Sequence, residues 1–297
     1  MYRSSFIVLI SFFLLLSFIF TEFFSNLGFT IPYLLGFVML AMGVTIRIDE
    51  LRRILREPKW IFTTVLLQYS VMPVLSVMIV NLFNFPKEIA LGFIILGSCP
   101  GGTASNVIAY ICGANLSLSI FCTFASTFMS VILTPFLIFL LADENININT
   151  LGLIKSTFLI VFLPVMIGFI LKLILGNKDK KYLKFFPFFS EIIIAFIIAI
   201  IFAINHENIY KISLFVLAGV ICHNLFGLYF SYQIAKFFRY PDDVKKTISI
   251  EVAMQNSGLG MTLALLHYTK LVALPSAIFS IWHNISAGGL VYLWKKK

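Results

Sequence analysis

Ten apolar stretches, each close to the length needed to cross a lipid bilayer, follow one another along the chain. A helix needs roughly 20 apolar residues to span about 30 Å of hydrocarbon. Division at the charged and Pro-, Gly- or Asn-rich interruptions gives segments at about 5–24, 30–46, 58–83, 87–111, 115–142, 151–175, 186–205, 209–237, 244–268 and 272–294. The sequence therefore predicts an all-α polytopic membrane protein of ten transmembrane helices.

Composition agrees with this prediction. Of the 297 residues, 60% are hydrophobic and only 12% are charged, about half the charged fraction of an ordinary soluble domain. The net charge of +9 is spread over short loops beside the hydrocarbon, so we interpret it as contact with anionic lipid headgroups and exclude nucleic acid as a partner. The four cysteines fall within or at the ends of apolar spans without metal-ligand spacing and are expected to be small buried side chains.

Lysine and arginine fall mainly on one side of this division. If the N-terminus is cytoplasmic, 18 of the 22 basic residues lie on the cytoplasmic side, and only Lys87, Lys155, Lys211 and Lys270 lie on the other. Short cytoplasmic loops are enriched in Lys and Arg, so both termini are predicted to be cytoplasmic, in the cell (inner or plasma) membrane. The first segment lacks an Ala-x-Ala cleavage site and is expected to be retained as a span.

The fourth and ninth segments both change from apolar to polar near their middles. Gly97–Asn106 reads GSCPGGTASN, and Glu251–Gly260 reads EVAMQNSGLG. Proline and glycine release backbone groups that hydrocarbon cannot satisfy, so two breaks at matched depth predict a shared polar cavity. The alternative is a pair of ordinary glycine kinks with Ser/Thr back-bonding.

The two halves of the chain have matching outlines. Five helices per half force the second half to be inverted, which predicts repeats at about 1–142 and 151–297. Half-helix N-termini favour an anion, while freed carbonyls and carboxamides offer hard oxygens to a small cation. A carboxylate inside the membrane marks a functional site, and Glu251 has proton carriage as its competing role.

These two motifs, together with Ile281–Ser286 (IWHNIS), resemble those of the bile acid:sodium symporter family over essentially the whole chain. The resemblance implies a single transporter domain with a panel of helices 1, 2, 6 and 7 and a core of helices 3–5 and 8–10. Helices 4 and 9 are expected to cross at their breaks, with two sodium ions behind the crossing. The core would then move against the panel in alternating access.

The resemblance also implies two co-transported sodium sites. The first would use Ser105, Asn106, Ser119, Thr123 and Glu251; the second would use Gln68, Glu251, Gln255 and the carbonyls of Val252 and Met254. Hard cations prefer such oxygen ligands. For Gln68 the alternative is an interhelical hydrogen bond, and for the Ser119/Thr123 pair it is back-bonding to the carbonyl four residues earlier.

The substrate is expected between core and panel, near Thr103, Asn256, Ser257, Gly258, His283 and Asn284. His283 alone would more often be a satisfied core residue than a ligand. Half-helix N-termini suit a carboxylate, so the resemblance implies sodium-coupled import of an organic anion, bile-acid-like or a small carboxylate such as pantoate, by a monomer. Cys222–Asn224 is expected to face the core.

Two other function classes remain for comparison. A proton-coupled transporter or an exporter of the same fold is compatible with the oxygen-rich breaks. An intramembrane hydrolase or a sensor fits poorly, because the spans contain no aspartate pair and no His-Glu-x-x-His motif, and no loop approaches domain length. A nucleotide-binding loop is also absent from the sequence, so we predict a secondary transporter and not an enzyme.

Overall fold

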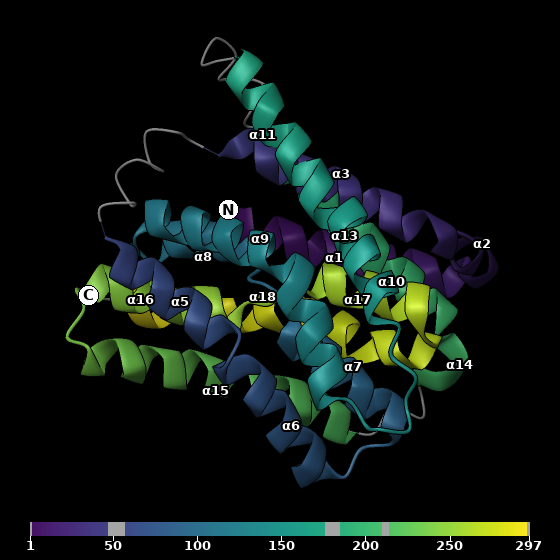
Figure 1. Ribbon diagram of the computed structural model, residues 1–297. Coiled ribbons are helices and arrows are strands. Elements are labelled where there is room, and N and C mark those ends of the chain that lie inside the picture. The colour runs from purple at the N-terminus through teal and green to yellow at the C-terminus, as the bar shows by residue number, and fades with distance from the viewer. Residues whose placement is uncertain (1, 47–56, 176–184, 210–213, 296–297) are drawn as a thin grey trace.

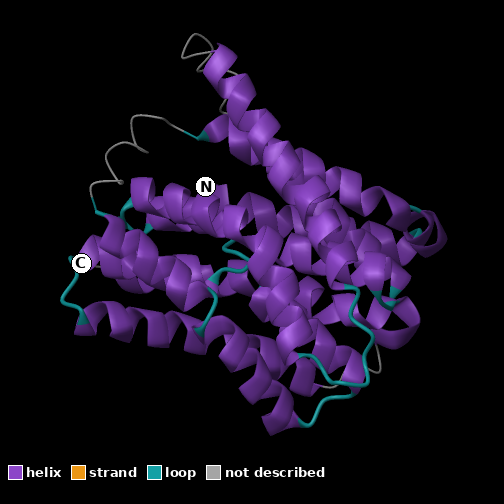
Figure 2. Ribbon diagram, in the orientation of Figure 1, coloured by secondary structure: helices purple, strands orange, loops and turns teal. Residues whose placement is uncertain are grey.

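The computed structural model describes residues 2–46, 57–175, 185–209 and 214–295, and every regular element in these ranges is helical (Figures 1 and 2). The α-helices are α1 (Tyr2–Ile19), α2 (Thr21–Asn26), α3 (Ile31–Thr45), α5 (Pro58–Gln68), α6 (Val71–Phe83), α7 (Lys87–Ser98), α8 (Ala104–Ile111), α9 (Leu116–Leu141), α10 (Thr150–Thr157), α11 (Leu163–Leu175), α13 (Phe185–Ile204), α14 (His206–Ile209), α15 (Leu214–Phe237), α16 (Asp242–Ala253), α17 (Ser257–His267) and α18 (Leu274–Lys295). Short 3₁₀ turns cover Gly28–Thr30 and Lys270–Ala273, and a π-turn at Phe158–Phe162 joins α10 to α11.

Within the described residues, each of the ten predicted segments overlaps one α-helix or two consecutive α-helices. The fourth segment is α7 and α8, and the ninth is α16 and α17, each pair separated by the predicted break. The third segment is also divided, into α5 and α6 at Tyr69–Ser70, which the sequence analysis did not predict. The basic residues at 47–56, 178–184, 211 and 296–297, on which much of the predicted orientation rests, lie outside the described residues.

Five helical stretches in the described ranges are long and apolar enough to cross a membrane. They are Gly28–Thr45, Pro58–Phe83, Leu116–Leu141, Thr150–Ile174 and Leu214–Phe237. The broken segments do not meet this criterion because their halves are too short. Many large apolar side chains, such as Phe62, Met78 and Phe139, are exposed on the outside of the helices, as expected where the surrounding solvent is lipid.

Local sequence explains several helix ends. Asn115 precedes α9, and its side chain accepts a 3.1 Å hydrogen bond from Leu118 N, which satisfies one of the free amides of the first turn. Pro58 opens α5, where its missing N–H costs nothing. Asn84 ends α6 in the left-handed conformation, which asparagine tolerates better than most residues.

One group of helices consists of α1, α3, α11 and α13, which pack on one another. The contact of α3 with α11 is close because glycines face the partner backbone. A Cβ at Gly43 would meet Phe169 N at 2.8 Å, and one at Gly168 would meet Val44 N at 3.0 Å. Small residues allow helices to approach closely where no water-driven hydrophobic force acts, as in a bilayer.

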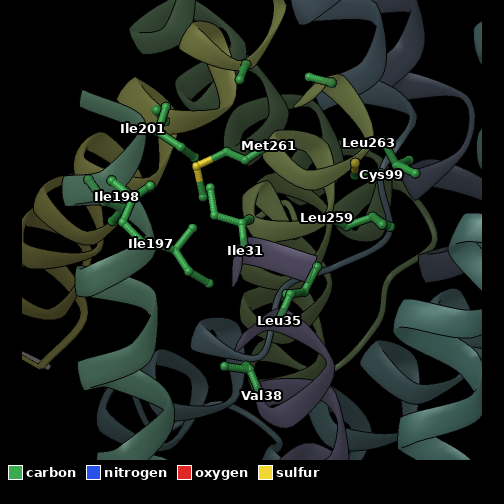
Figure 3. Close-up of a cluster of buried hydrophobic side chains, with 14 of the residues drawn as sticks. Ile31, Leu35, Val38, Cys99, Ile197, Ile198, Ile201, Leu259, Met261 and Leu263 are labelled. Carbon is green, nitrogen blue, oxygen red and sulfur yellow. The ribbon is translucent and has the colours of Figure 1, made fainter. Parts of the chain in front are cut away.

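The second group contains α5–α9 and α15–α18. In it, α15 packs on α6 and α16, while α7 packs on α6, α9 and α18. The two groups meet in an apolar cluster, in which side chains of α3, α13 and α17 gather around Leu35, Ile198 and Met261 (Figure 3). The short helix α10, which continues through the π-turn into α11 of the first group, is joined to the end of α17 by a 2.8 Å hydrogen bond between Ser156 Oγ and His267 Nε2.

The two breaks cross in the second group and pair through their backbones. Gly102 N donates to Met254 O at 2.6 Å, and Asn256 N donates to Pro100 O at 2.8 Å. An isolated antiparallel bridge joins Gly101 to Gln255. The broken helices therefore satisfy part of each other's freed backbone, which the membrane interior requires.

Gly102 leaves room for this pairing. A Cβ there would lie 2.8 Å from Gln255 O and 3.1 Å from Gln255 C. Gly102→Ala should therefore destabilise the protein by about 1–3 kcal/mol, since backbone lies on both sides of the contact. The thermal unfolding midpoint in detergent should fall by several degrees.

Gly289→Ala is the matched control, because nothing lies within 4 Å of a Cβ at that position of α18. Alanine favours a helix over glycine by up to about 1 kcal/mol, so this midpoint should stay the same or rise. Equal midpoints for the two variants would contradict the close crossing.

Candidate functional site

Glu251 is a buried carboxylate at the crossing, surrounded by hydroxyl groups. Its Oε2 accepts hydrogen bonds from Ser105 Oγ at 2.8 Å and from Ser119 Oγ at 2.7 Å, and Thr123 Oγ1 donates to Oε1. The four side chains are each at most 1% exposed. Three separate helices, α8, α9 and α16, therefore place their oxygens around one carboxylate.

Asn106 completes this group of oxygens. Its Oδ1 lies 2.8 Å from Ser119 Oγ and 3.4 Å from Thr123 Oγ1, and Ser105 Oγ also lies 2.7 Å from Gly102 O. Each hydroxyl has one hydrogen, so the three hydroxyls cannot satisfy all of these acceptors at once. An excess of convergent oxygen lone pairs is the arrangement that a small hard cation binds.

The predicted second group of oxygens centres on two glutamines. Gln68 Nε2 lies 2.7 Å from one terminal atom of the Gln255 amide and 2.9 Å from the other, and it donates to Cys99 O at 3.0 Å. Gln255 also approaches Val252 O, at 3.4 Å. The interhelical hydrogen bond considered for Gln68 is therefore present. Its Oε1 is buried without a hydrogen-bond partner among the described residues.

Two members of the predicted second set have other partners. The carbonyl of Met254 accepts the crossing bond from Gly102 N. The hydrogen bonds of Glu251 within the described ranges go to the hydroxyl group and not to the glutamines. The structure thus brings Gln68, Gln255 and Val252 together, beside a carboxylate that is hydrogen-bonded elsewhere.

The charge of this region comes from Glu251. Within the described ranges no Lys, Arg or His forms a salt bridge with it, and no three His, Cys, Asp or Glu side chains lie close enough to hold a metal ion. A buried carboxylate without a counter-ion is costly in a medium of low dielectric constant. One carboxylate among neutral oxygens suits a monovalent cation.

Side chains from neighbouring helices satisfy the remaining backbone of the breaks. Thr134 donates to Ser98 O at 2.7 Å and Asn224 donates to Ala253 O at 3.0 Å, while Ser126 Oγ accepts from Gly101 N at 3.3 Å. Thr134 and Ser126 are residues that the sequence analysis missed, since Ser and Thr are common in membrane helices and give no distinct signal. Through its bond to Ala253 O, Asn224 of α15 points toward α16, within the second helix group.

A cavity of about 380 Å³ lies beside the crossing. Its walls come from α3 and α13 on one side and from α8, α9, α17 and α18 on the other. All six predicted substrate residues line it, namely Thr103, Asn256, Ser257, Gly258, His283 and Asn284. Asn106 and Gln255 of the two oxygen groups line it as well.

Two half-helices begin at this cavity. α8 starts at Ala104 and α17 at Ser257, and both first turns contribute to its walls, through Ala104 and Asn106 and through Ser257 and Gly258. The amides of a helix N-terminus carry partial positive charge and favour an anion. One amide of α17 is already satisfied, because Asn256 Oδ1 accepts from Leu259 N at 3.1 Å.

Polar groups of α18 face the same space. Ser280 Oγ lies 2.5 Å from Ser257 Oγ, and its carbonyl accepts from Asn284 Nδ2 at 2.7 Å. His283 is 5% exposed, and its Nδ1 has no hydrogen-bond partner among the described residues. This histidine is therefore not fully satisfied by the protein, in contrast to the alternative considered for it.

Glu191 of α13 is a cavity residue that sequence reasoning missed. It lies near the cytoplasmic end predicted for its segment, where a single carboxylate is expected at the boundary between membrane and water and does not indicate a binding site. The signal that could have identified Glu191 is its charge, because it falls inside the predicted span 186–205.

The sequence pattern of the Sodium Bile acid symporter family matches residues 32–212. The sodium-dependent transporter YocS of Bacillus subtilis (strain 168) is 36% identical over 285 residues, which cover 96% of this chain and 89% of the relative. The probable chloroplastic sodium/metabolite cotransporter BASS1 of Arabidopsis thaliana is 39% identical over 269 residues, 88% of this chain and 66% of the relative. Its counterpart BASS2 of Oryza sativa subsp. japonica is 31% identical over 272 residues, 89% of this chain and 63% of the relative.

The side chain of Asn256 has a structural role that can be measured apart from any ligand. Asn256→Ala removes the cap of α17, and Asn149→Ala removes the equivalent cap of α10, where Asn149 Oδ1 accepts from Gly152 N at 2.9 Å. Each loss should cost about 1 kcal/mol, seen as a lower thermal midpoint. No loss of stability in Asn256→Ala would contradict the cap.

Proposed function

We propose that this chain, which belongs to the Sodium Bile acid symporter family, imports an organic anion together with two sodium ions. Its relatives are named as sodium-dependent transporters and sodium/metabolite cotransporters, so the chain is a sodium-dependent membrane transporter and not an enzyme. The finer points, which are the ions bound, the residues used, the direction and the substrate, are our proposal.

The observation that carries the proposal is the buried Glu251 within three hydroxyls at the crossing. We assign this group, with Asn106, as the first sodium site. A bound cation would turn the hydroxyl hydrogens away and take their oxygens as ligands. It would also offset the cost of holding the carboxylate out of water.

The second sodium site is proposed around the two glutamines. The free Oε1 of Gln68, the amide oxygen of Gln255 and the carbonyl of Val252 supply neutral oxygens. Glu251 and the carbonyl of Met254 would join them when the ion binds, which requires small rotations at the break. One carboxylate shared by two sodium ions leaves a single positive charge, which a monovalent organic anion balances.

Coupling between ions and substrate follows from residues that belong both to a proposed sodium site and to the cavity wall. Asn106 and Gln255 contact the oxygen groups and also line the cavity. Sodium bound behind the crossing would fix the orientation of these two amides. The cavity would then present ordered donors to the substrate, and each ligand would strengthen binding of the other, as linkage requires.

Alternating access is proposed to move the two helix groups against each other. The group of α1, α3, α11 and α13, with the short α10, corresponds to the panel, and α5–α9 with α15–α18 correspond to the core. Both groups line the cavity. Ten spans in two inverted repeats, about 1–142 and 151–297, form this single transporter domain.

The cavity also includes Thr45, Ile46 and Ile111, at helix ends that the positive-inside rule assigns to the cytoplasm. The conformation is therefore proposed to face inward in the cell (inner or plasma) membrane, with both termini cytoplasmic. The transporter is proposed to act as a monomer.

The substrate is proposed to place its negative group at the N-termini of α8 and α17, near Thr103, Ser257 and Asn284. The remaining walls include Leu35, Val38 and other apolar side chains. Such a site fits a bile-acid-like anion or a small carboxylate such as pantoate, because a few polar groups orient the ligand and apolar walls cover the rest.

Sodium should stabilise the purified protein, because a ligand that binds only the native state raises stability by mass action. The gain is about 2.7 kcal/mol at a sodium concentration one hundred times Kd. The thermal midpoint should be higher in sodium chloride than in potassium or choline chloride. Glu251→Ala should abolish this difference together with sodium-driven uptake.

Glu22→Ala on the exposed first turn of α2 is the control and should keep the sodium effect. Uptake that persists in Glu251→Ala with unchanged sodium dependence would refute the proposed site. Equal midpoints in all three salts, with a pH-dependent shift lost in Glu251→Ala, would instead favour the proton-coupled transporter of the same fold.

Asn284→Ala should weaken binding of the anion at least tenfold and leave sodium binding intact, since one hydrogen bond to a charged group is worth about 1.5–3 kcal/mol and 1.4 kcal/mol is a factor of about ten. Pantoate and cholate serve as probes in titrations of the thermal midpoint at saturating sodium. Asn147→Ala in an exposed loop is the control. Loss of the sodium effect as well would show that Asn284 is structural.

A further inference from the structure

Glu191 is the only Asp, Glu, Lys or Arg among the described residues that line the cavity. It lies on α13 with its side chain half-buried. Its Oε2 is shielded from solvent and has no hydrogen-bond partner within the described part of the chain. A shielded carboxylate oxygen without a donor is unfavourable, so a donor on a ligand bound in the cavity would stabilise it.

No described side chain on the same wall donates a hydrogen bond to Oε2 of Glu191. The α3 contribution is mainly apolar, with Leu35, Val38 and Met39, and Ile194 lies one turn along α13. The groups suited to an anion are instead on α8, α17 and α18, in the other helix group. The two walls of the cavity therefore differ in the charge they accept.

A substrate with only a carboxylate and an apolar tail would fit this cavity poorly. The apolar tail of such a substrate would lie against Glu191 and leave the lone pairs of Oε2 unsatisfied. The carboxylate of the substrate would also be repelled by the carboxylate of Glu191. Sites that contain a buried polar group reject ligands lacking the matching group more strongly than they reject small differences in apolar size.

We propose that Glu191 binds a hydrogen-bond donor on the substrate, a hydroxyl or an ammonium group placed away from the carboxylate that the half-helices receive. The substrate class is then a hydroxy- or amino-carboxylate rather than a plain carboxylate. This inference rests on the proposed function, because it needs an anion in the same cavity. Glu191 is in this view a specificity-determining residue on the panel side.

The test uses matched carboxylates in sodium chloride, with the thermal midpoint of the purified full-length protein as readout. The probes are the straight-chain acids from butanoate to octanoate and, for each length, the acids with a terminal hydroxyl or a terminal amine. For at least one length, the substituted acid should bind to the wild type about tenfold more tightly than the plain acid, the factor expected for one hydrogen bond to a charged group.

Two substitutions separate charge from hydrogen bonding. Glu191→Ala should remove the preference for both substituents and should bind the plain acids at least as well as the wild type does. Glu191→Gln should keep the preference for the hydroxyl acid over the plain acid, since its amide oxygen still accepts a hydrogen bond. In the wild type the charged amine should be preferred over the hydroxyl, and Glu191→Gln should lose this difference because its charge is gone. Glu207→Gln on α14, outside the cavity, is the control and should behave as the wild type.

The outcomes distinguish a failure of the inference about Glu191 from a failure of the proposed symporter function. If plain and substituted acids bind equally, or if the preference survives in Glu191→Ala, the inference is wrong and the symporter proposal stands. The midpoints of the two glutamine variants are also compared with no acid added. A lower midpoint for Glu191→Gln than for Glu207→Gln would show that Glu191 has a partner within the protein, and this would also overturn the inference. If no acid binds to the wild type in sodium, the proposed function fails and the inference fails with it.

Discussion

Satisfaction of broken backbone inside an apolar medium is the constraint on which this structure depends. Two helices stop midway, and each break exposes amides and carbonyls that lipid cannot bind. The structure meets this requirement by laying one break across the other, with Gly102 N bonded to Met254 O and Asn256 N bonded to Pro100 O. Gln68, Thr134 and Asn224 bind further carbonyls of the breaks from outside.

That solution also determines where the functional groups lie. Ser105 and Asn106 follow one break and Glu251 precedes the other, so pairing the backbones brings these side chains together. On the opposite side of the same crossing, Thr103, Asn256 and Ser257 face the cavity. The proposed cation ligands and the proposed anion ligands therefore gather at the same crossing.

Local properties of the sequence predicted much of this arrangement. Helix segments follow from runs of apolar residues, and the breaks follow from Pro100, Gly101 and the polar run after Glu251, because these effects act within one stretch of chain. Of the six predicted substrate residues, four were chosen by their position at the breaks, and His283 and Asn284 were chosen from the Ile281–Ser286 motif of the resemblance; all six line one cavity. Their role in binding stays a prediction, as do the sodium ligands.

Other features depend on contacts between distant segments and could not be predicted. Gly102 is needed because Gln255 O lies against it, and that distance exists only after two helices cross. The pairing of Gln68 with Gln255, 187 residues away, was expected from the family resemblance and not from local sequence. Glu191 was not singled out from the sequence, and only the packing of α13 beside the cavity shows its oxygen without a donor among the described residues.

The contacts between the two helix groups differ in kind along α17. Around Leu259 and Leu263 they are aliphatic (Figure 3), and such contacts have no preferred direction, so one apolar neighbour can replace another at little cost. Ser156 and His267 are joined by a directional hydrogen bond about 15 Å from the cavity end of the helix. If the two groups move against each other as proposed, a tilt about the hydrogen-bonded end would keep this bond and would displace the cavity end of α17 farthest.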